Sequence, residues 1–410
     1  MLLPSTSPFR NSPAFRYLFA AQMVSGFGSA LTYVVLPFEM YRLTKSPLLV
    51  GLLGVVEFVP MLLLGFVGGA LADHFERKRL IVAAELAMLL TLALLAANAA
   101  QAHPALWPMW LAAGLLAGLT ALHRPAMQAL TPQLLRLEDM TAAAAWQSIG
   151  SINYIVGPAL AGMIASVYGA QVAFALDGAT YAFSLLMITR VSGIPPHPNA
   201  EERLTWASSI EGWRYARGRQ DLLGTYLIDM NAMFFGMPNA LFPAIAERWG
   251  PGTLGLLYAA PFVGSLVAAS TSNWTSRIHR HGLAITLAAA GWGLGMVGFG
   301  LASSLGVALS FLALAGAADM ISGVFRMTIW NQTIPARLRG RLAAIEMVSY
   351  SSGPYLGNAE AGFAASLFGL QAAVVSGGVL CVVGAGVLAI LLPKFIKYDS
   401  REALLHPEGF

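Results

Sequence analysis

The stretch GALADHFERKR, residues 69–79, separates two long apolar runs of the chain. It places Asp73 four residues before Arg77, ahead of a group of basic residues. Short basic loops between apolar helices mark the cytoplasmic side of a membrane. The stretch therefore predicts two membrane helices joined on that side. An anchor needs only the basic residues, so Asp73 indicates an additional role.

The composition predicts an all-α polytopic membrane protein. The chain has 410 residues, of which 57% are hydrophobic and 11% charged, whereas soluble domains carry about 25% charged residues. The apolar residues form repeated runs long enough to cross a hydrocarbon core of about 30 Å. The net charge of +4 does not indicate a nucleic-acid partner, because the basic residues lie in short loops between apolar runs. The expected surroundings are a lipid bilayer.

The apolar runs predict twelve transmembrane helices. An even number places both termini on one side. With the N-terminus inside, only Arg42, Lys45 and Arg248 of the 24 basic residues fall outside, which favours cytoplasmic termini in a plasma (inner) membrane. The predicted spans are 15–41, 48–72, 80–101, 105–130, 140–167, 170–191, 220–246, 252–275, 282–302, 305–330, 340–367 and 370–393.

The longest polar segment, residues 192–219, divides the spans six and six. We therefore expect four parts: an N-terminal six-helix bundle over 1–191, a cytoplasmic linker over 192–219, a C-terminal six-helix bundle over 220–393, and a cytoplasmic tail over 394–410. The linker is either a helix on the inner leaflet or a simple connection.

The two halves resemble each other at an offset of about 200 residues. Several positions of 161–173 recur in 361–373, and Asp73 and Arg77 match Asn273 and Arg277. Parallel repeats of six spans describe the two pseudo-symmetric bundles of the major facilitator fold.

The chain resembles the major facilitator superfamily in four places. The pattern Gly69-x-Leu-Ala-Asp73-x-x-x-Arg77-Lys78 is similar to the superfamily's signature loop. Span five carries a partial copy of the antiporter motif typical of exporters, with Asn153 and Ala161 where glycines are usual. The stretches PAMQALTP, 125–132, and FALD, 174–177, resemble the branch that contains enterobactin exporters and macrolide-efflux proteins.

The resemblance implies a conformational gate made of Gly69, Asp73, Arg77 and Lys78. Asp73 would meet the N-terminus of a neighbouring helix near Gly340, where the helix dipole stabilises a carboxylate, and lock the outward-open state. The alternative is a positively charged anchor alone. Under the gate hypothesis, Asp73→Asn impairs turnover more than membrane insertion.

The resemblance also implies an antiporter-like kink in span five, at Asn153, Gly157, Pro158 and Gly162. Proline removes an intrahelical hydrogen bond, and glycines allow close helix contact. An ordinary membrane-helix kink is the alternative.

Charged side chains inside a membrane are costly and mark functional sites. We expect Asp229 and Asp319 to carry protons, with Glu57 and Glu346 as further proton-coupling candidates. The alternative is a static ion pair, such as that of Asp319 with Arg326, seven residues apart on one helix face. Asp177, in an outer span, is expected to have a structural, hydrogen-bonding role.

Polar and aromatic residues on the spans that line the cavity of the resembled fold are candidates for substrate contact. Aromatic rings suit amphipathic molecules, and arginines suit anionic groups, although most aromatic residues of such a chain simply face lipid or core. The candidates are Gln22, Tyr33, Arg124, Asn231, Phe234, Phe235, Arg326 and Asn331.

The sequence lacks the motifs of enzymes and ATP-driven pumps. It contains no GKS/GKT phosphate loop, GxSxG or HExxH, and with Cys381 as its one cysteine it has no disulfide and no Cys/His metal cluster. We therefore expect no enzyme, no metal and no cofactor, with the proton motive force as the energy source.

The predicted function is proton-coupled secondary export of small amphipathic organic molecules, of siderophore or drug/macrolide type. The mechanism is alternating access by a monomeric antiporter. A nutrient importer or facilitator of the same fold, and a non-transporting membrane receptor, are the alternatives.

Overall fold

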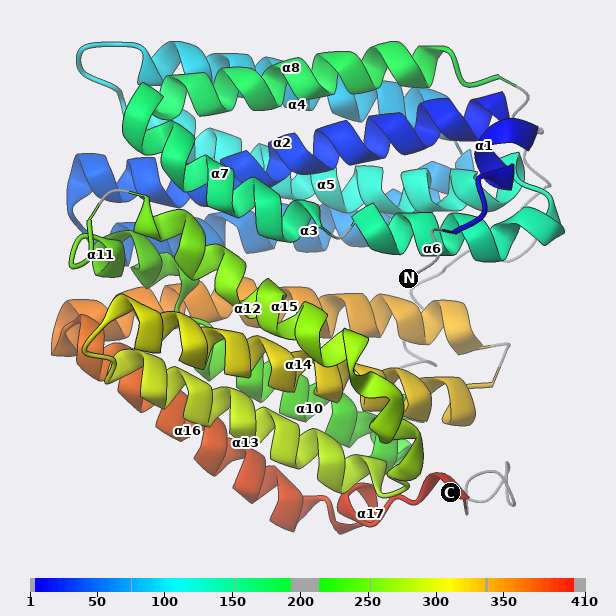
Figure 1. Cartoon of the computed structure of the whole chain (residues 1–410), viewed down its shortest axis with the longest axis vertical. Coiled ribbons are helices and arrows are strands. Elements are labelled where there is room, and N and C mark those ends of the chain that lie inside the picture. The colour runs from blue at the N-terminus through cyan, green and yellow to red at the C-terminus, as the bar shows by residue number, and fades with distance from the viewer. Residues whose placement is uncertain are drawn as a thin grey trace. The chain divides into compact units, whose positions relative to one another are not determined.

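The computed structural model describes residues 4–74, 76–150, 152–192, 214–250, 252–335 and 338–401, without the side chains of 66–74, 339–341, 343–345 and 347–348. Most of the predicted linker, residues 193–213, lies outside this part. Throughout the described ranges the regular elements are helices (Figure 1), accompanied by one isolated bridge between Arg280 and Asp399. The expected all-α fold is therefore confirmed.

The helices follow the apolar runs. In the first half they are α1 (Ser7–Asn11), α2 (Pro13–Thr44), α3 (Pro47–His74), α4 (Arg77–Ala99), α5 (Trp107–Leu134), η1 (Leu137–Asp139), α6 (Met140–Gly150), α7 (Asn153–Tyr168) and α8 (Ala170–Thr189). The second half contains α10 (Gln220–Phe235), η2 (Asn239–Leu241), α11 (Phe242–Ala246), α12 (Thr253–Ser270), η3 (Ser272–Arg277), α13 (His281–Gly300), α14 (Leu305–Thr333), α15 (Arg339–Phe368), α16 (Leu370–Leu391) and α17 (Pro393–Ile396).

Nine stretches of described helix are long and apolar enough to span a membrane. They correspond to nine of the twelve predicted spans. The other three predicted spans coincide with α5, α10 and α15, which carry charged side chains such as Arg124, Asp229 and Glu346. The helices are therefore consistent with twelve spans. Two of these three helices, α10 and α15, contribute side chains to the site described below.

Contacts between Cα atoms divide the chain into two compact units. Unit 1 contains Met1–Thr44, Val56–Arg203 and Pro251–Leu256, and unit 2 contains Lys45–Val55, Leu204–Gly250 and Leu257–Phe410. In unit 1, α2 packs against α5, α7 and α8, α8 packs against α4 and α7, and α4 packs against α5. Apolar side chains fill this bundle, among them the buried Leu18, Ile81, Leu130 and Ile188 from four helices.

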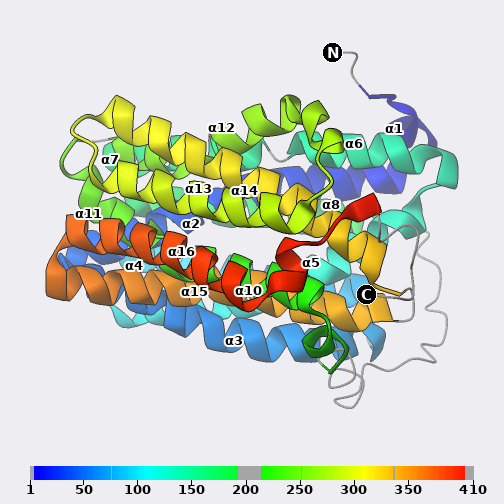
Figure 2. The same ribbon diagram turned by 90° about the horizontal axis from the view of Figure 1, so that it is seen from below.

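Unit 2 repeats the same set of helix pairs. Helix α10 packs against α14, α15 and α16, α16 packs against α13 and α15, and α13 packs against α14. Figure 2 shows α10, α15 and α16 running side by side. The two bundles are therefore pseudo-symmetric, as the sequence predicted.

Glycines 200 residues apart support the repeat in atomic detail. Gly169 has φ 85° and ψ 163°, and Gly369 has φ 85° and ψ 162°, a conformation that side chains disfavour. Each glycine directly precedes the last long helix of its bundle. Gly178 faces Leu92 of α4, and Gly378 faces Val297 of α13, the packing partners of α8 and α16. The two halves therefore share the glycine conformation before their last long helix and the packing of that helix.

The predicted span five comprises α6 and α7, on either side of residue 151, which lies outside the described part of the chain. Helix α6 ends at Gly150, α7 begins at Asn153, and the buried Pro158 lies inside α7. The proline cannot donate to the carbonyl four residues before it, here that of Tyr154, so one hydrogen bond is missing inside α7. The Asn153 side-chain Nδ2 donates to the Met23 carbonyl at 2.8 Å, which ties the start of α7 to α2.

The segment after α16 folds back onto unit 2. Helix α17 packs against α10 and α13, and Phe395 and Tyr398 are fully buried. The Tyr398 hydroxyl donates to Gln332 Oε1 at 3.0 Å, and the Ser400 amide donates to the His279 carbonyl at 3.0 Å. These contacts hold the segment after α16 against the end of α14 and the start of α13.

Candidate functional site

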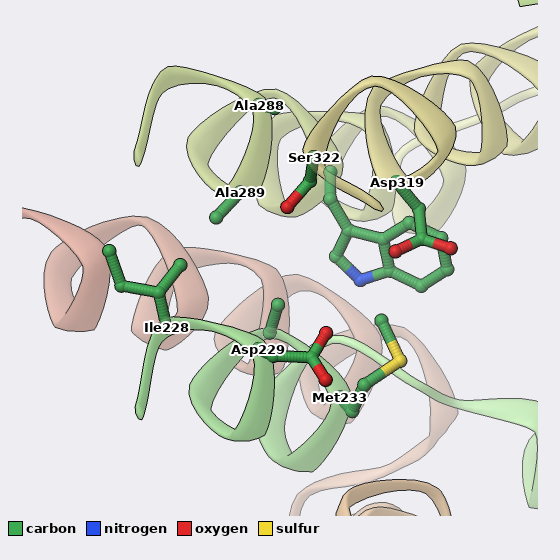
Figure 3. A pocket seen from close by; sticks show the side chains of 9 residues that line it. Ile228, Asp229, Met233, Ala288, Ala289, Asp319 and Ser322 are labelled. Atoms are coloured by element: carbon green, nitrogen blue, oxygen red, sulfur yellow. The ribbon is translucent and has the colours of Figure 1, made fainter. Parts of the chain in front are cut away.

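A small pocket in unit 2 lies between α10, α13 and α14. Its volume of about 10 Å³ is the space of a single water molecule. Asp229 of α10 and Asp319 of α14 point toward this space from opposite sides, as Figure 3 shows. The lining residues are Ile228, Asp229, Ala232, Met233, Ala288, Ala289, Trp292, Asp319 and Ser322.

Arg326 connects the two acids. Its Nη1 forms an ion pair with Asp229 Oδ1, and its Nη2 lies 3.5 Å from Asp319 Oδ1. The side chains of Arg326 and Asp229 are 12% and 8% exposed, whereas that of Asp319 is 40% exposed. One guanidinium therefore holds one buried and one more accessible carboxylate.

Helical spacing explains how the sequence builds this arrangement. Asp319, Ser322 and Arg326 follow one another at intervals of three and four residues on α14, so they share a face. On α10, Ala232 and Met233 lie three and four residues after Asp229, on the same face as this acid. The Trp292 indole donates to the Gly236 carbonyl at 2.8 Å, which fixes α13 against the end of α10.

A third acid belongs to the same cluster. Glu346 of α15 interacts electrostatically with both Arg326 and Tyr226. The Tyr226 hydroxyl is buried and has no hydrogen-bond partner among the described residues. Its ring stacks on Trp330 with centroids 5.7 Å apart, and the Trp330 indole donates to Thr225 Oγ1 at 2.9 Å.

The charges of this cluster do not balance when every group is ionised. Asp229, Asp319 and Glu346 would carry three negative charges against one positive charge on Arg326. Uncompensated charge is expensive in a low-dielectric interior, and carboxyl groups respond by binding protons. The arrangement can therefore take up protons, and it can exchange them for a cationic or hydrogen-bonding group.

The structure brings together only some of the predicted coupling and cavity residues. Asp229, Asp319, Arg326 and Glu346 form one cluster, whereas Glu57 lies on α3 in unit 1. The proposed static pair of Asp319 with Arg326 exists, but the sequence analysis missed Asp229 as the closer partner of the arginine.

The remaining cavity candidates have other surroundings. The Asn231 side-chain Nδ2 donates to the Cys381 carbonyl of α16 at 2.9 Å, so it holds two helices together. The rings of Phe234 and Phe235 contact each other edge to face, with their centroids 4.9 Å apart. The others lie on α2, α5 and α14: Gln22 is partly buried, and Tyr33, Arg124 and Asn331 are exposed. Their substrate contact stays a prediction.

The predicted gate is only partly described. Gly69, Asp73 and Gly340 lie in the ranges 66–74 and 339–341, of which the structure describes the backbone alone. Lys78 Nζ donates to the carbonyls of Thr189 at 2.9 Å and Val191 at 2.7 Å, where α8 ends. A cation at a helix C-terminus is stabilising, so Lys78 has a structural contact in addition to any role in a gate.

Unit 1 contains buried polar groups, one of which the sequence analysis overlooked. Asp177 accepts hydrogen bonds from Thr32 Oγ1 at 2.5 Å and Thr180 Oγ1 at 3.2 Å, which confirms its expected hydrogen-bonding role. Glu85 was not considered, although an isolated acid inside the apolar run 80–101 is the signal that selected the other candidates. Its side chain is fully buried and meets His123 and Ser184.

Two pseudo-symmetric helical bundles, each with ionisable side chains in its interior, are the architecture of a membrane transporter of the major facilitator type. The family model of the transmembrane secretion effectors matches residues 4–408, and the chain belongs to this family.

Comparison with known proteins agrees with this assignment. The chain is 28% identical over 395 residues to the enterobactin exporter EntS of Shigella boydii serotype 4, and 27% identical to that of Escherichia coli O1:K1. Each match covers 95% of this chain and 94% of the relative.

Solved structures share the fold. The nucleoside transporter NupG matches with a TM-score of 0.72 and 13% identity over 94% of this chain and 100% of the other. The POT family transporter PepTSo matches with a TM-score of 0.72 and 12% identity, covering 94% and 98%.

Proposed function

We propose that the protein is a proton-coupled secondary exporter of small amphipathic organic molecules, working by alternating access as a monomer. The observation that carries the proposal is the cluster of Asp229, Asp319 and Glu346 around Arg326. A scaffold or receptor gains nothing from a buried cluster with two surplus carboxylates, whereas an antiporter needs groups that bind protons in one state and release them in another.

The arginine gives the cluster two alternative partners. When Asp319 is protonated, Arg326 pairs with Asp229 alone, and the more exposed Asp319 is neutral. When Asp319 releases its proton, the guanidinium is shared between both carboxylates. A substrate that competes for Arg326 would therefore favour one protonation state over the other, which is the differential interaction that coupling requires.

The relatives suggest the substrate and the direction. They are enterobactin exporters, and their similarity covers nearly the whole chain. We propose export of an enterobactin-like siderophore across the inner membrane, with both termini in the cytoplasm and the proton motive force as the energy source. The drug/macrolide type is tested as the alternative substrate class.

The experiment measures uptake into inside-out vesicles with an imposed pH gradient, acidic inside. Labelled enterobactin and a labelled macrolide are compared, because either would travel in the export direction. We expect gradient-dependent uptake of enterobactin by the wild type and a loss of at least about tenfold in Asp229→Asn. Ser322→Ala is the matched control, since it changes the same pocket without removing a charge.

Uptake that ignores the gradient in the wild type would refute proton coupling. Uptake of the macrolide alone would refute the siderophore assignment. Loss of the same size in Ser322→Ala would show that the pocket tolerates no change, and would remove the argument from charge.

A further inference from the structure

Two buried polar atoms beside the cluster in unit 2 have no hydrogen-bond partner in the described part of the chain. They are the Tyr226 hydroxyl of α10 and the Arg326 Nε of α14. Tyr226 is 6% exposed, and the side chain of Arg326 is 12% exposed. Buried polar groups almost always have a partner, and an exception requires an explanation. A group supplied by a bound molecule is one such explanation.

Helical spacing places an aromatic layer next to the ion pair of Arg326 with Asp229. Tyr226 lies three residues before Asp229 on α10, and Trp330 lies four residues after Arg326 on α14, each on the face of its partner. The two rings stack with their centroids 5.7 Å apart. The Trp330 indole donates to Thr225 Oγ1 at 2.9 Å, which fixes its ring against α10.

Helix α15 brings an acid to the same place. Ser349, three residues after Glu346, donates to the backbone carbonyl of Tyr226 at 3.3 Å, so this face of α15 lies against α10. Glu346 interacts electrostatically with both Tyr226 and Arg326. It is not hydrogen-bonded to the Tyr226 hydroxyl or to Arg326 Nε, because neither atom has a described partner. Glu346 is partly exposed, so the group of three is accessible from its side.

The chemistry of these atoms selects the group that fits between them. Arg326 Nε can only donate a hydrogen bond, an ionised Glu346 can only accept one, and the Tyr226 hydroxyl can do either. A hydroxyl group of a ligand accepts from the guanidinium and donates to the carboxylate at the same time. An ammonium group has no acceptor to offer to Arg326, and an anionic group would join three carboxyl groups around one cation.

We propose that Tyr226, Arg326 and Glu346 form a subsite for a neutral hydroxyl group carried on an aromatic ring of the transported molecule. The ring of the ligand lies beside the stacked rings of Tyr226 and Trp330, which suit a planar aromatic partner. Its hydroxyl oxygen accepts from Arg326 Nε, and its proton is donated to Glu346 or to the Tyr226 oxygen. The subsite rests on the proposed function, since the exported molecule brings the hydroxyl group.

The first test requires no ligand. It compares the thermal unfolding midpoints of Tyr226→Phe and Tyr398→Phe, measured on the full chain in detergent. Tyr398 is the matched control, because it is another buried tyrosine of unit 2 and its hydroxyl donates to Gln332 Oε1 at 3.0 Å. Removal of an unpartnered hydroxyl costs no hydrogen bond. Tyr226→Phe should therefore unfold at or above the wild-type temperature, and Tyr398→Phe about 2 °C below it.

The second test measures the binding of four para-substituted benzamides to the purified full chain by saturation-transfer difference NMR titration. The substituent is a hydroxyl, methyl, carboxylate or aminomethyl group, so one ring carries a neutral polar, apolar, anionic or cationic group. We expect the hydroxyl compound to bind most tightly, and at least about fivefold more tightly than the methyl compound. Tyr226→Phe should reduce this ratio at least about twofold, whereas Tyr398→Phe should keep it.

Tighter binding of the carboxylate or aminomethyl compound would overturn the proposal, as would equal binding of the hydroxyl and methyl compounds. A midpoint that falls as far in Tyr226→Phe as in Tyr398→Phe would show that the hydroxyl already has a partner, and would overturn it too. If Tyr226→Phe does not fold, Trp330→Leu decides: it should weaken the hydroxyl and methyl compounds by the same factor, and unchanged binding of both refutes the subsite.

These measurements use neither a pH gradient nor enterobactin, so their failure is distinguishable from that of the proposed function. A wrong ranking of the four compounds leaves gradient-driven uptake of enterobactin standing. Uptake that ignores the gradient refutes proton coupling and leaves the ranking unchanged.

Discussion

The two bundles share their helix packing, but the acidic side chains discussed above have different kinds of partner in each bundle. In unit 1, Asp177 and Glu85 contact hydroxyl groups and an imidazole. In unit 2, Asp229 and Asp319 contact a guanidinium, which is charged at all physiological pH values. The difference teaches that acids on the same scaffold can have either neutral donors or a cation as partners.

The positions that differ lie on equivalent helices. Asp177 and Ser184 of α8 correspond, 200 residues on, to Gly377 and Gly384 of α16. Gly384 makes room for the side chain of Asn231, which donates to the Cys381 carbonyl.

The largest effect on stability is expected for Arg326→Gln. It leaves Asp229 and Asp319 without their cation. Removal of one partner of a buried ion pair costs about 3–5 kcal/mol. Chemical unfolding in detergent at neutral pH measures the loss, and Arg326→Lys, which retains the charge, should lose less. A cost below about 1 kcal/mol would mean that the acids of unit 2 are already neutral, and the contrast between the bundles would disappear.

A smaller loss is expected for Asp177→Asn in unit 1. The amide retains one acceptor oxygen but presents an amino group to one of the two threonine hydroxyls, so the free energy of unfolding should fall by about 1–3 kcal/mol. The pH profile of transport should remain that of the wild type. A displaced profile would show that Asp177 takes part in proton exchange, contrary to its closed set of contacts.

Removal of Lys78 tests the contact at the end of α8. Lys78→Met loses the two hydrogen bonds to the carbonyls of Thr189 and Val191, with an expected cost of about 0.5–1 kcal/mol. Lys78→Arg serves as the control, because it keeps a donor and a charge. If transport falls strongly while stability is unchanged, the residue acts in the predicted gate instead.

The smallest effect is expected at the C-terminal end of unit 2. Hydrogen bonds from Arg401 hold the pKa of Asp399 well below its usual range. The contribution of this carboxylate is therefore present above its normal pKa and is lost only when the pH falls through the lowered value. Asp399→Asn should therefore lower the unfolding midpoint only slightly, and by the same amount at pH 5 and at pH 8; a large loss would mean that this pair anchors the segment after α16.

The sequence predicted the architecture because its signals are local. Apolar runs indicate helices, and the 200-residue offset is visible in positions such as Gly169 and Gly369. The site depended on contacts between helices, which periodicity does not reveal. The spacing of Asp319 and Arg326 indicated their pairing, whereas Asp229 lies on another helix.

The same reason explains the other differences. The position of Asn231 in span seven predicts that it faces a cavity, but it does not reveal the hydrogen bond that Asn231 donates to α16. Pro158 predicts a bend in span five, and that bend stays a prediction. Glu85 carried the same signal as the other buried acids, but only the packing of α4 against α5 and α8 shows its partners.

The most direct test of the account compares two modes of transport in Asp319→Asn. Accumulation of labelled enterobactin against its gradient requires protons, whereas exchange of labelled for unlabelled substrate at equilibrium does not. We predict that this variant loses gradient-driven accumulation but retains exchange at a rate within about threefold of the wild type. Accumulation equal to that of the wild type would contradict the claim that the acids around Arg326 carry the coupled proton.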